Sequence, residues 1–514
     1  MLAKVFSSAI VGLEAIPVEV EVEFSSKQLP SFTIVGLPDK AVQEAKERVS
    51  SAVRKLIKEW PWKKITVNLA PADIPKCGAS FDLPIAVGIL AASNLIKVPQ
   101  DTMITGELSL EGFVKPVHGV ISMVEKAQEL NFKEVYVPKG NELEGSWADI
   151  DVYGISTLEQ LYTHFKGEKI NPVKKKASLT LKEDMYENDF SLIRGQPIAK
   201  RALEIAAAGG HNVLMVGPPG GGKTMLARAF QTILPPMSIN ESLEVTRIYS
   251  VAGKIPPFTS LITNRPFRKP HHTASPTALI GGGTIPHPGE VSLAHNGVLF
   301  LDEFAEFPRR ALDALRQPME DKYVTISRTA GTVTFPANFI LIGAMNPCPC
   351  GWFGDPQREC RCTITEIKNY RKHISGPITD RIDIFVRVER IKPSELERKE
   401  DCESSKEIRE RVIKAIEIQK ERFSLFRGKD KGVVAFCNAT TPQKDIENFV
   451  KMTRKAKSFL LKAVETLSLS ARSYFRVIKV ARTIADLEGS VSINSTHISE
   501  ALQFRADVFG DEKL

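Results

Sequence analysis

The 514-residue sequence lacks an apolar run long enough to cross a lipid bilayer. Its longest apolar stretch, Leu83 to Ala92, is well short of the roughly 20 residues that a transmembrane helix needs. The first residues, MLAKVFSSAIVGLEA, are only weakly like a signal peptide, because Glu14 interrupts them and the alternating strand pattern VEVEVEF (18–24) follows. We therefore expect a folded N-terminus, a cytoplasmic location and no membrane partner.

Cysteine is sparse, and the net charge is small for a chain of this length. Four of the seven cysteines fall between positions 348 and 362, and the other three are scattered. One cluster in a long chain without a signal peptide argues against a disulfide framework and for a metal site. A net charge of +8 permits a polyanionic partner without requiring one. Internal repeats and low-complexity tracts are also lacking.

What is present predicts an α/β multidomain protein. Residues 1–165 mix strand patterns with helical ones, and Asp39 is placed to cap the helical pattern that follows it. Residues 166–187 are polar and lysine-rich, as in a linker. Residues 188–392 carry the phosphate-binding motifs described next, and residues 393–514 have mainly helical patterns.

A glycine-rich loop between a strand and a helix is the strongest motif. In HNVLMVGPPGGGKTMLARAF, an apolar strand runs into G-x-x-x-x-G-K-T and then into a helix. Glycines let backbone N–H groups turn toward phosphates, Lys223 can reach the β- and γ-phosphates, and Thr224 can ligate Mg²⁺. We predict that ATP and Mg²⁺ bind here, at Gly217, Pro218, Pro219, Gly220, Gly221, Gly222, Lys223 and Thr224.

Two further apolar strands end in polar side chains. NGVLFLDEF (296–304) delivers Asp302, which is suited to hold Mg²⁺, and Glu303, which is suited to polarise the attacking water. NFILIGAMNP delivers Asn346, which would face the γ-phosphate beside them. Two acids and an amide at strand ends indicate that ATP is hydrolysed rather than only bound.

These motifs, with SGPITDRIDI and SLSARSYFR further along, resemble those of the AAA+ ATPases related to magnesium chelatase, and most of all the YifB/ComM branch. The resemblance covers nearly the whole chain and implies a AAA+ P-loop α/β core at 188–392 and a helical lid of the magnesium chelatase C-terminal type. It also implies that Asn346 is the sensor-1 residue, Arg381 the arginine finger, and Arg472 the sensor-2 arginine, with Arg476 as the alternative. A finger that acts on a neighbouring subunit implies a homo-oligomeric ring, usually a hexamer in this family.

Residues 1–165 are similar to the Lon protease domain in two segments, which implies a Lon-like (S5 domain 2-like) α+β fold. PKCGASFDLPIA places Ser80 at the position of the Lon nucleophile, and TGELSLEGFVKPVHG resembles the stretch before the catalytic lysine. Ile121 stands at the lysine position, five residues after Pro116, and an isoleucine cannot serve as a base. Cys77 and Asp82 also depart from the Lon pattern. We expect a Lon-like domain without a catalytic dyad, in which Ser80 caps a helix.

Basic residues cluster in the insertion NRPFRKPHHTASPTALIGGGTIPHPGEVSLAH, at Arg265, Arg268, Lys269, His271 and His272. Either this is a pore-facing loop that meets a phosphate backbone, or it is a solvated loop that packs on the next subunit. The segment 321–339 predicts two strands around a basic turn that begins at Arg328, a hairpin that lines the pore in the resembled family. Its tip lacks the aromatic residue with which protein-threading ATPases grip, and therefore suits a nucleic-acid backbone better.

The cysteine cluster CPCGWFGDPQRECRC has the spacing C-x-C, nine residues, C-x-C. Four thiolates could close a tetrahedral zinc site, although C-x-C is tighter than the usual C-x₂-C, and reduced cysteines without metal are the alternative. The zinc ligands would be Cys348, Cys350, Cys360 and Cys362. Their place after the sensor-1 strand suggests that they pin a loop near the subunit interface.

The features of the insertion and the hairpin favour an ATP-driven DNA motor. The resemblance to the YifB/ComM branch implies a motor of the helicase or branch-migration type, as in natural transformation or recombination. Its partner would be single-stranded, duplex or branched DNA. One alternative is a chaperone or remodelling ATPase of the magnesium chelatase type with a protein client, although the resemblance implies that the chelatase motor lacks such an N-terminal domain. The other alternative is an ATP-dependent protease, which Ile121 opposes.

Overall fold

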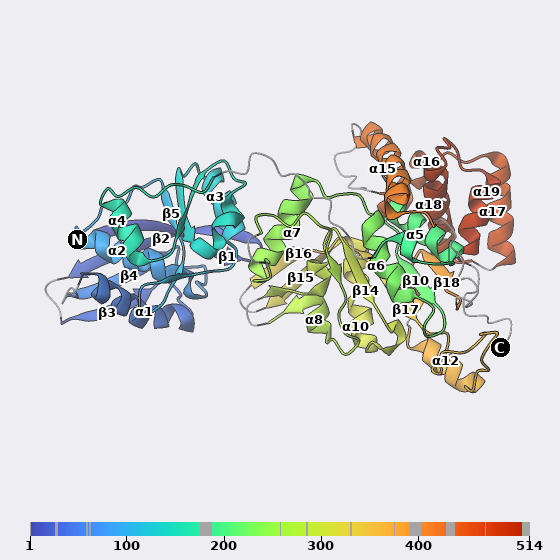
Figure 1. Cartoon of the computed structure of the whole chain (residues 1–514), viewed down its shortest axis with the longest axis horizontal. Coiled ribbons are helices and arrows are strands. Elements are labelled where there is room, and N and C mark those ends of the chain that lie inside the picture. The colour runs from blue at the N-terminus through green and yellow to red at the C-terminus, as the bar shows by residue number, and fades with distance from the viewer. Residues whose placement is uncertain are drawn as a thin grey trace.

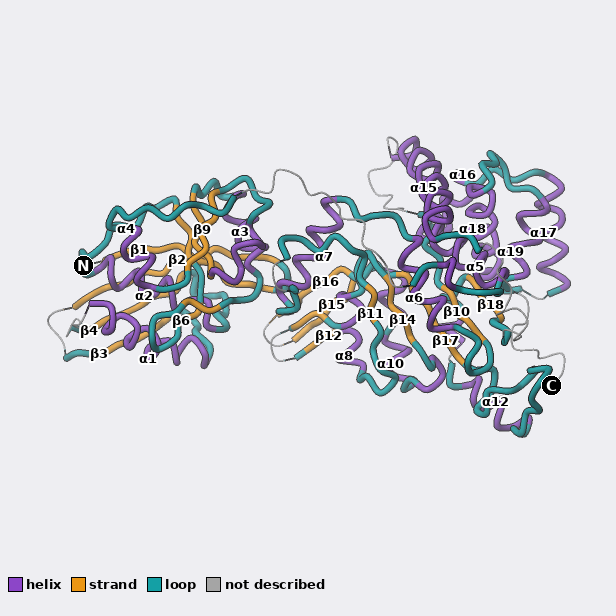
Figure 2. The backbone as a smooth tube through the Cα atoms, viewed as in Figure 1, coloured by secondary structure: helices purple, strands orange, loops and turns teal. Residues whose placement is uncertain are grey.

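A computed structural model describes residues 2–25, 29–57, 60, 63–174, 188–256, 259–283, 286–328, 331–374, 376–390, 402–427, 437–467 and 469–505. Most of the expected linker (175–187), the expected start of the C-terminal helices (393–401) and the hairpin tip (329–330) lie outside these residues. The described residues form an N-terminal region (2–174), a central region (188–390) and a C-terminal region (402–505), which follow one another along the long axis of the molecule (Figures 1 and 2). None of the described helices combines the length and apolarity needed to span a membrane.

A seven-stranded mixed sheet forms the N-terminal region, in the order β3-β4-β2-β1-β5-β8-β9. The VEVEVEF alternation lies in β2, and it turns Val18, Val20 and Val22 into the core, as predicted from a period of two. The elements are β1 (Leu2–Val11), β2 (Glu14–Ser25), β3 (Ser31–Val35), α1 (Lys40–Ile57), β4 (Lys64–Ala70), η1 (Ala79–Phe81), α2 (Asp82–Ala92), β5 (Thr102–Ile104), β6 (Glu107–Leu108), β7 (Val114–Lys115), α3 (Val120–Glu129), β8 (Glu134–Pro138), η2 (Lys139–Gly145), β9 (Asp151–Ile155) and α4 (Leu158–Phe165).

Helices α1 and α2 cover the core of this sheet and contact each other. Asp39 caps α1 as predicted, since its Oδ1 accepts a hydrogen bond from the backbone N–H of Val42 at 2.8 Å. The prediction that Ser80 caps a helix is wrong. Ser80 lies inside the 3₁₀ turn η1, whose N-cap is Gly78 at φ 83°, and neither η1 nor α2 has a side-chain cap. The turn begins before the serine, because only the glycine tolerates this left-handed backbone.

The central region is built on a five-stranded parallel sheet, in the order β11-β14-β17-β10-β18. Its inner strands are apolar throughout, as expected for a parallel sheet with both faces covered. The elements are η3 (Phe190–Leu192), α5 (Pro197–Gly209), β10 (Val213–Val216), α6 (Lys223–Ile233), α7 (Ile239–Val251), β11 (Phe267–Arg268), α8 (Pro276–Ile280), β12 (Gly281–Gly282), β13 (His287–Pro288), α9 (Glu290–Leu293), β14 (Val298–Leu301), η4 (Phe304–Glu306), α10 (Arg309–Ala314), α11 (Arg316–Asp321), β15 (Tyr323–Arg328), β16 (Gly331–Pro336), β17 (Ile340–Met345), α12 (Ile364–Lys372), α13 (Gly376–Thr379) and β18 (Ile384–Arg387).

Helices make up the C-terminal region and share one hydrophobic core with the central region. The buried face of α18 contributes Val477, Val480, Ala481 and Ile484 at helical spacing, and α18 packs on α5 and α15. The elements are α15 (Ser405–Arg427), η5 (Asn438–Thr440), η6 (Gln443–Asp445), α16 (Ile446–Phe449), α17 (Arg454–Thr466), α18 (Ala471–Leu487) and α19 (Ser495–Gln503).

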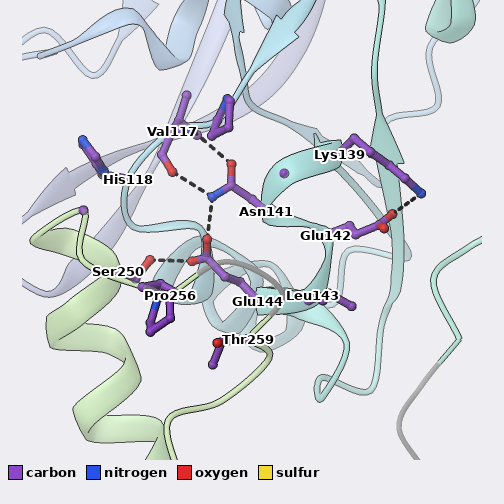
Figure 3. Close-up of a pocket in the computed structure, with 14 residues that line it drawn as sticks. Val117, His118, Lys139, Asn141, Glu142, Leu143, Glu144, Ser250, Pro256 and Thr259 are labelled. Carbon is purple, nitrogen blue, oxygen red and sulfur yellow. Dashed lines mark hydrogen bonds and ion pairs between the residues drawn. The ribbon is translucent and has the colours of Figure 1, made fainter. Parts of the chain in front are cut away.

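The N-terminal and central regions meet at α7. Ser250 of α7 donates its hydroxyl to Glu144 at 2.6 Å, and Asn141 donates to the same carboxylate from the other side (Figure 3). Burial raises the pKa of Glu144, although these hydrogen bonds favour the charged form. A second link is the ion pair of Arg247 with Glu125 at 2.7 Å. A cavity of about 540 Å³ opens beside these groups, and none of its lining residues comes from the glycine-rich loop.

Candidate functional site

The glycine-rich loop follows the buried strand β10 and ends where α6 begins. Gly220 and Gly222 have φ values of 78° and 85°, in the left-handed region that glycine adopts without strain. A side chain at Gly217 would collide with the carbonyl oxygen of Val388, which follows β18. The glycines of the motif are therefore needed for the path of the loop, whose last residue is also the N-cap of α6. A helix N-terminus of this kind favours an anion.

Lys223 and Asn346, predicted to act on the same phosphate, lie next to each other. The Lys223 ammonium is 3.3 Å from Asn346 Oδ1, and it also donates to the carbonyl oxygens of Gly217 and Pro218 at 2.6 and 2.9 Å. Burial lowers the pKa of Lys223 to about 8, and the nearby Asp302 carboxylate partly opposes this. A phosphate would supply the counter-charge that this desolvated ammonium needs.

Thr224 and Asp302 present two oxygen atoms at a spacing that fits Mg²⁺. Thr224 Oγ1 lies 3.1 Å from Asp302 Oδ2. Adjacent ligands of an octahedral Mg²⁺, each about 2.1 Å from the ion, are about 3 Å apart. The two residues come from α6 and from the end of β14, and the packing of β14 and β10 on either side of β17 brings them together.

Glu303 has an uncommon backbone conformation for its residue type. It sits directly after Asp302 at φ 53° and ψ 46°, in the left-handed region, and its side chain is 58% exposed. This conformation costs a non-glycine residue about 1–2 kcal/mol. Such strain is concentrated at functional sites, where the surrounding structure holds it. The backbone N–H of Glu303 donates to Asp302 Oδ1 at 3.1 Å, so the position of each acid depends on the other.

The basic residues of the insertion are held within their own chain. Lys269 Nζ lies 2.7 Å from Asp302 Oδ2, His272 Nδ1 lies 2.8 Å from Glu303 Oε2, and Arg268 pairs with Glu290 at 2.6 Å. Neither interpretation from the sequence included these ion pairs within the chain, although Lys269 and His271 are also exposed to solvent. The order of the strands in the central sheet explains these contacts. Because β11 pairs in parallel with β14, the residues after β11 emerge at the same sheet edge as Asp302.

The other two residues of the insertion's basic cluster are also engaged within the chain. Arg265 donates to the carbonyl oxygens of Pro235 and Asn296 at 2.6 and 2.7 Å, and its guanidinium lies beside Glu241. His271 packs against the ring of His272, with 4.2 Å between their centroids. These contacts fix the start and the end of the stretch that carries Lys269.

The three arginines implied by the resemblance differ in their freedom to move. Arg381 is 12% exposed, pairs with Glu320 at 2.6 Å and donates to the Pro377 carbonyl oxygen at 2.7 Å. Arg472 is 59% exposed and lies 3.4 Å from Asp380. Arg476 pairs closely with the buried Asp383, whose pKa is strongly lowered: burial opposes this, but Arg476 and His211 outweigh it. Arg472 is thus freer than Arg476 to meet a nucleotide.

The four clustered cysteines converge on one point. Their sulfur atoms all lie within 4.8 Å of one another, and the Cys348–Cys350, Cys348–Cys360 and Cys350–Cys360 separations are 3.4, 3.6 and 3.6 Å. Sulfur ligands 2.3 Å from a tetrahedral zinc ion are about 3.8 Å apart, so the set fits Zn²⁺.

Backbone N–H groups donate hydrogen bonds to this cysteine cluster and favour the thiolate form that binds a cation. The N–H of Phe353 donates to Cys348 Sγ at 3.3 Å, and the N–H of Cys350 donates to Cys362 Sγ at 3.4 Å. Burial opposes ionisation of Cys350, but backbone N–H groups and the neighbouring thiols lower the pKa of its thiol to about 6. Gly351, inside the cluster, lies against Pro219 of the glycine-rich loop. The cysteine loop is therefore a support for the phosphate site.

Gln196 is a site residue that the sequence reasoning missed. It sits at φ 60° before α5, and its Nε2 donates to the carbonyl oxygen of Gly221 in the loop at 3.4 Å and to that of Glu389. The Gly-Gln-Pro sequence before α5 is a possible signal of an unusual turn, but nothing in it points to the glycine-rich loop. Lys269 and His272 were noticed as basic residues, and their contacts with the acids were missed.

The residues at the positions that resemble the Lon pattern make defined contacts in this structure. Ile121 is fully buried at the start of α3, and the nearby Lys76 donates its ammonium to the carbonyl oxygen of Pro71. Asp82 is fully buried beside Ser80 and forms a two-point ion pair with Arg48. The departure from the Lon pattern at position 82 thus has a structural role.

Comparisons with known proteins cover the whole chain. Family models match residues 18–141 ("Subunit ChlI of Mg-chelatase"), 189–396 ("Magnesium chelatase, subunit ChlI") and 402–505 ("Magnesium chelatase, subunit ChlI C-terminal"). The first of these matches lies within the N-terminal region.

Individual proteins are also similar to this chain in sequence. Competence protein ComM of Haemophilus influenzae is 44% identical over 523 residues, which cover 100% of this chain and 99% of that protein. Uncharacterized protein YifB of Escherichia coli is 41% identical, over 98% of this chain and 97% of that protein. An archaeal Lon protease of Thermococcus kodakarensis is 27% identical over 170 residues, 31% of this chain and 27% of that protein. The chain belongs to the YifB/ComM family of magnesium chelatase-like AAA+ ATPases.

Proposed function

We propose that the chain hydrolyses ATP at the edge of the central sheet. Lys223 binds the phosphates, Thr224 and Asp302 hold Mg²⁺, which neutralises phosphate charge, and Glu303 polarises the attacking water, with Asn346 beside them. The observation that carries this proposal is the 3.1 Å contact of Thr224 Oγ1 with Asp302 Oδ2, next to a strained glutamate. Gln196 and the cysteine loop support the phosphate-binding loop from two sides.

The active form that we propose is a homo-oligomeric ring of six subunits. Arg381 lies in a segment 376–383 that is held by Glu320 and by backbone contacts of its own subunit. In the ring it would leave Glu320 and meet the phosphates of a neighbour, while Arg472 on α18 would act on the nucleotide of its own subunit. An arginine that stabilises developing phosphate charge contributes about 10³–10⁵-fold to turnover in other NTPases.

DNA is the substrate that we propose for this ring, which would act as a helicase or branch-migration motor. Two observations support it: the full-length similarity to a protein named for competence, and the hairpin β15–β16, in which Arg328 pairs in register with Gly331. A cationic hairpin end suits a phosphate backbone of any sequence. Arg268 and Lys269 no longer support the proposal, because both are engaged within the central region.

The N-terminal region completes the proposal as a Lon-like domain (1–165) without peptidase activity. A linker (166–187) joins it to the AAA+ core (188–392), and a helical lid (393–514) follows. Zinc on the four clustered cysteines would stabilise the loop that supports Pro219. We also propose that the protein acts in the cytoplasm.

An ATPase assay of the full-length protein with and without single-stranded, duplex and branched DNA tests this function. At low salt, DNA is expected to stimulate turnover, and the stimulation should fall steeply as salt rises, because phosphate contacts release counterions. ATP hydrolysis that no DNA stimulates would refute the motor. In that case a protein client of the chelatase-remodeller kind would become the better hypothesis, and absence of hydrolysis would refute the ATPase itself.

A further inference from the structure

One lysine of the insertion lies on the Mg²⁺ ligand itself. Lys269 Nζ is 2.7 Å from Asp302 Oδ2, and its ammonium also lies over the ring of Phe300, 5.3 Å from the centroid. Phe300 is a buried residue of β14, two positions before Asp302. One contact from β14 and one from the residue that follows this strand therefore hold the lysine, although its side chain is 38% exposed.

The oxygen that Lys269 contacts is the one that Mg²⁺ would use. Asp302 Oδ2 also accepts the hydrogen bond from Thr224 Oγ1, so it is the carboxylate oxygen turned toward the second Mg²⁺ ligand. The other oxygen, Oδ1, accepts the backbone N–H of Glu303. A divalent ion between Thr224 and Oδ2 would repel an ammonium group within 3 Å of the same oxygen. The ion and the ammonium therefore compete for this oxygen.

The neighbouring contacts keep the lysine in place. The residue before it, Arg268, forms a two-point ion pair with Glu290 at 2.6 and 2.8 Å, and His272, three residues after it, contacts Glu303. The Lys269 backbone is therefore attached on both sides. Displacement of its ammonium from Asp302 therefore requires a change of side-chain rotamer and no movement of the backbone.

We propose that Lys269 is a positioning residue that holds Asp302 Oδ2 as a counter-ion and must be displaced by Mg²⁺ when the nucleotide binds. This inference rests on the proposed nucleotide site and adds a competitor for the metal to it. Lys269 thereby lowers the gain in nucleotide affinity that Mg²⁺ provides. It also keeps Asp302, whose side chain is 28% exposed, paired whenever the metal is absent.

Nucleotide-binding titrations of the full-length protein test the proposal without any turnover. The dissociation constant of a fluorescent ADP is measured in Mg²⁺ and in EDTA. The constant in EDTA divided by the constant in Mg²⁺ gives the gain in affinity that the metal provides. For Lys269→Met we expect this ratio to rise about two- to fivefold, the size of a half-exposed ion pair. Lys269→Arg should keep the wild-type ratio, because a guanidinium can form the same ion pair.

A matched control is Lys254→Met. Lys254 is also half-exposed and lies 3.8 Å from Glu290, but it contacts neither Asp302 nor Glu303. Its ratio should equal that of the wild type. An unchanged ratio in Lys269→Met overturns the proposal. Equal weakening of both constants also overturns it, because Lys269 would then be a phosphate ligand. A wild type that binds no nucleotide in Mg²⁺ would refute the proposed function itself, whereas loss of DNA stimulation alone would leave this inference intact.

Discussion

Replacement of Arg48 by methionine is expected to destabilise the N-terminal region, because it leaves a buried carboxylate without its counter-ion. Asp82 accepts Arg48 Nε at 2.6 Å, Arg48 Nη2 at 3.0 Å and the backbone N–H of Leu108 at 3.1 Å. Removal of one partner of a buried ion pair costs about 3–5 kcal/mol. Because the Arg48 side chain is still 22% exposed, water screens part of the interaction, and we expect the lower end, about 3 kcal/mol.

The loss of stability in the Arg48→Met variant should grow as the pH rises. Burial raises the pKa of Asp82 even with Arg48 and Leu108 opposing it, and removal of Arg48 would raise it further. Between the unfolded pKa of about 4 and the raised folded pKa, the folded state holds a proton that the unfolded state has lost. Stability therefore falls with rising pH through this window. The free energy of unfolding of the variant should be nearest to that of the wild type at about pH 4 and furthest below it at neutral pH.

Hydrogen exchange of the α2 amides in the full-length protein measures this local free energy. The matched control is Arg54→Met. Arg54 lies on α1, as Arg48 does, but it stacks over Trp60, and its replacement should change the exchange of α2 little. The double variant Arg48→Met/Asp82→Asn should recover part of the loss, since the amide needs no counter-ion and still accepts the Leu108 N–H. A loss below about 1 kcal/mol, or no recovery in the double variant, would refute the assignment of a buried ion pair.

Four further outcomes are expected. Glu303→Gln should bind ATP normally but lose at least about 10²-fold in turnover, because water activation is removed; equal turnover in a steady-state assay would contradict its role. Metal analysis should find about one zinc per chain, and the Cys360→Ser/Cys362→Ser variant should lose it together with thermal stability; a metal-free wild type of full stability would argue against the site. Arg381→Ala should bind nucleotide and lose most ATPase activity, so an unaffected rate in the assembled protein would exclude a finger in trans. Unfolded substrates should stay intact with or without ATP, and degradation abolished specifically by Ser80→Ala would show that the dyad prediction is wrong.

Local patterns predicted the elements that they encode. The β2 alternation, the α1 apolar stripe with its Asp39 cap and the hairpin β15–β16 are all found, since each is written in a contiguous stretch. The strand, loop and helix around Lys223 were placed correctly for the same reason. The convergence of Asp302 and Asn346 on the loop could be inferred because parallel strands end at one sheet edge.

Contacts that depend on strand order were out of reach. β11 is only two residues long, and no pattern in the sequence shows that it lies beside β14. Without that neighbour, Lys269 and His272 read as basic loop residues instead of partners of Asp302 and Glu303. The ion pair of Arg476 was likewise out of reach, because its partner Asp383 lies about 90 residues away in the sequence.

The N-terminal region retains a role in this structure that needs no peptidase dyad. Its β1–β2 turn places Gly12 against Val333 of the hairpin, where a side chain at position 12 would collide with the valine. At its other contact, Glu144 accepts the Ser250 hydroxyl at the end of α7. The region thus touches both the hairpin and the helix that leads into the insertion. Ile121, which stands where the Lon pattern has a lysine, is buried and packs within α3, so its side chain also serves this structural role.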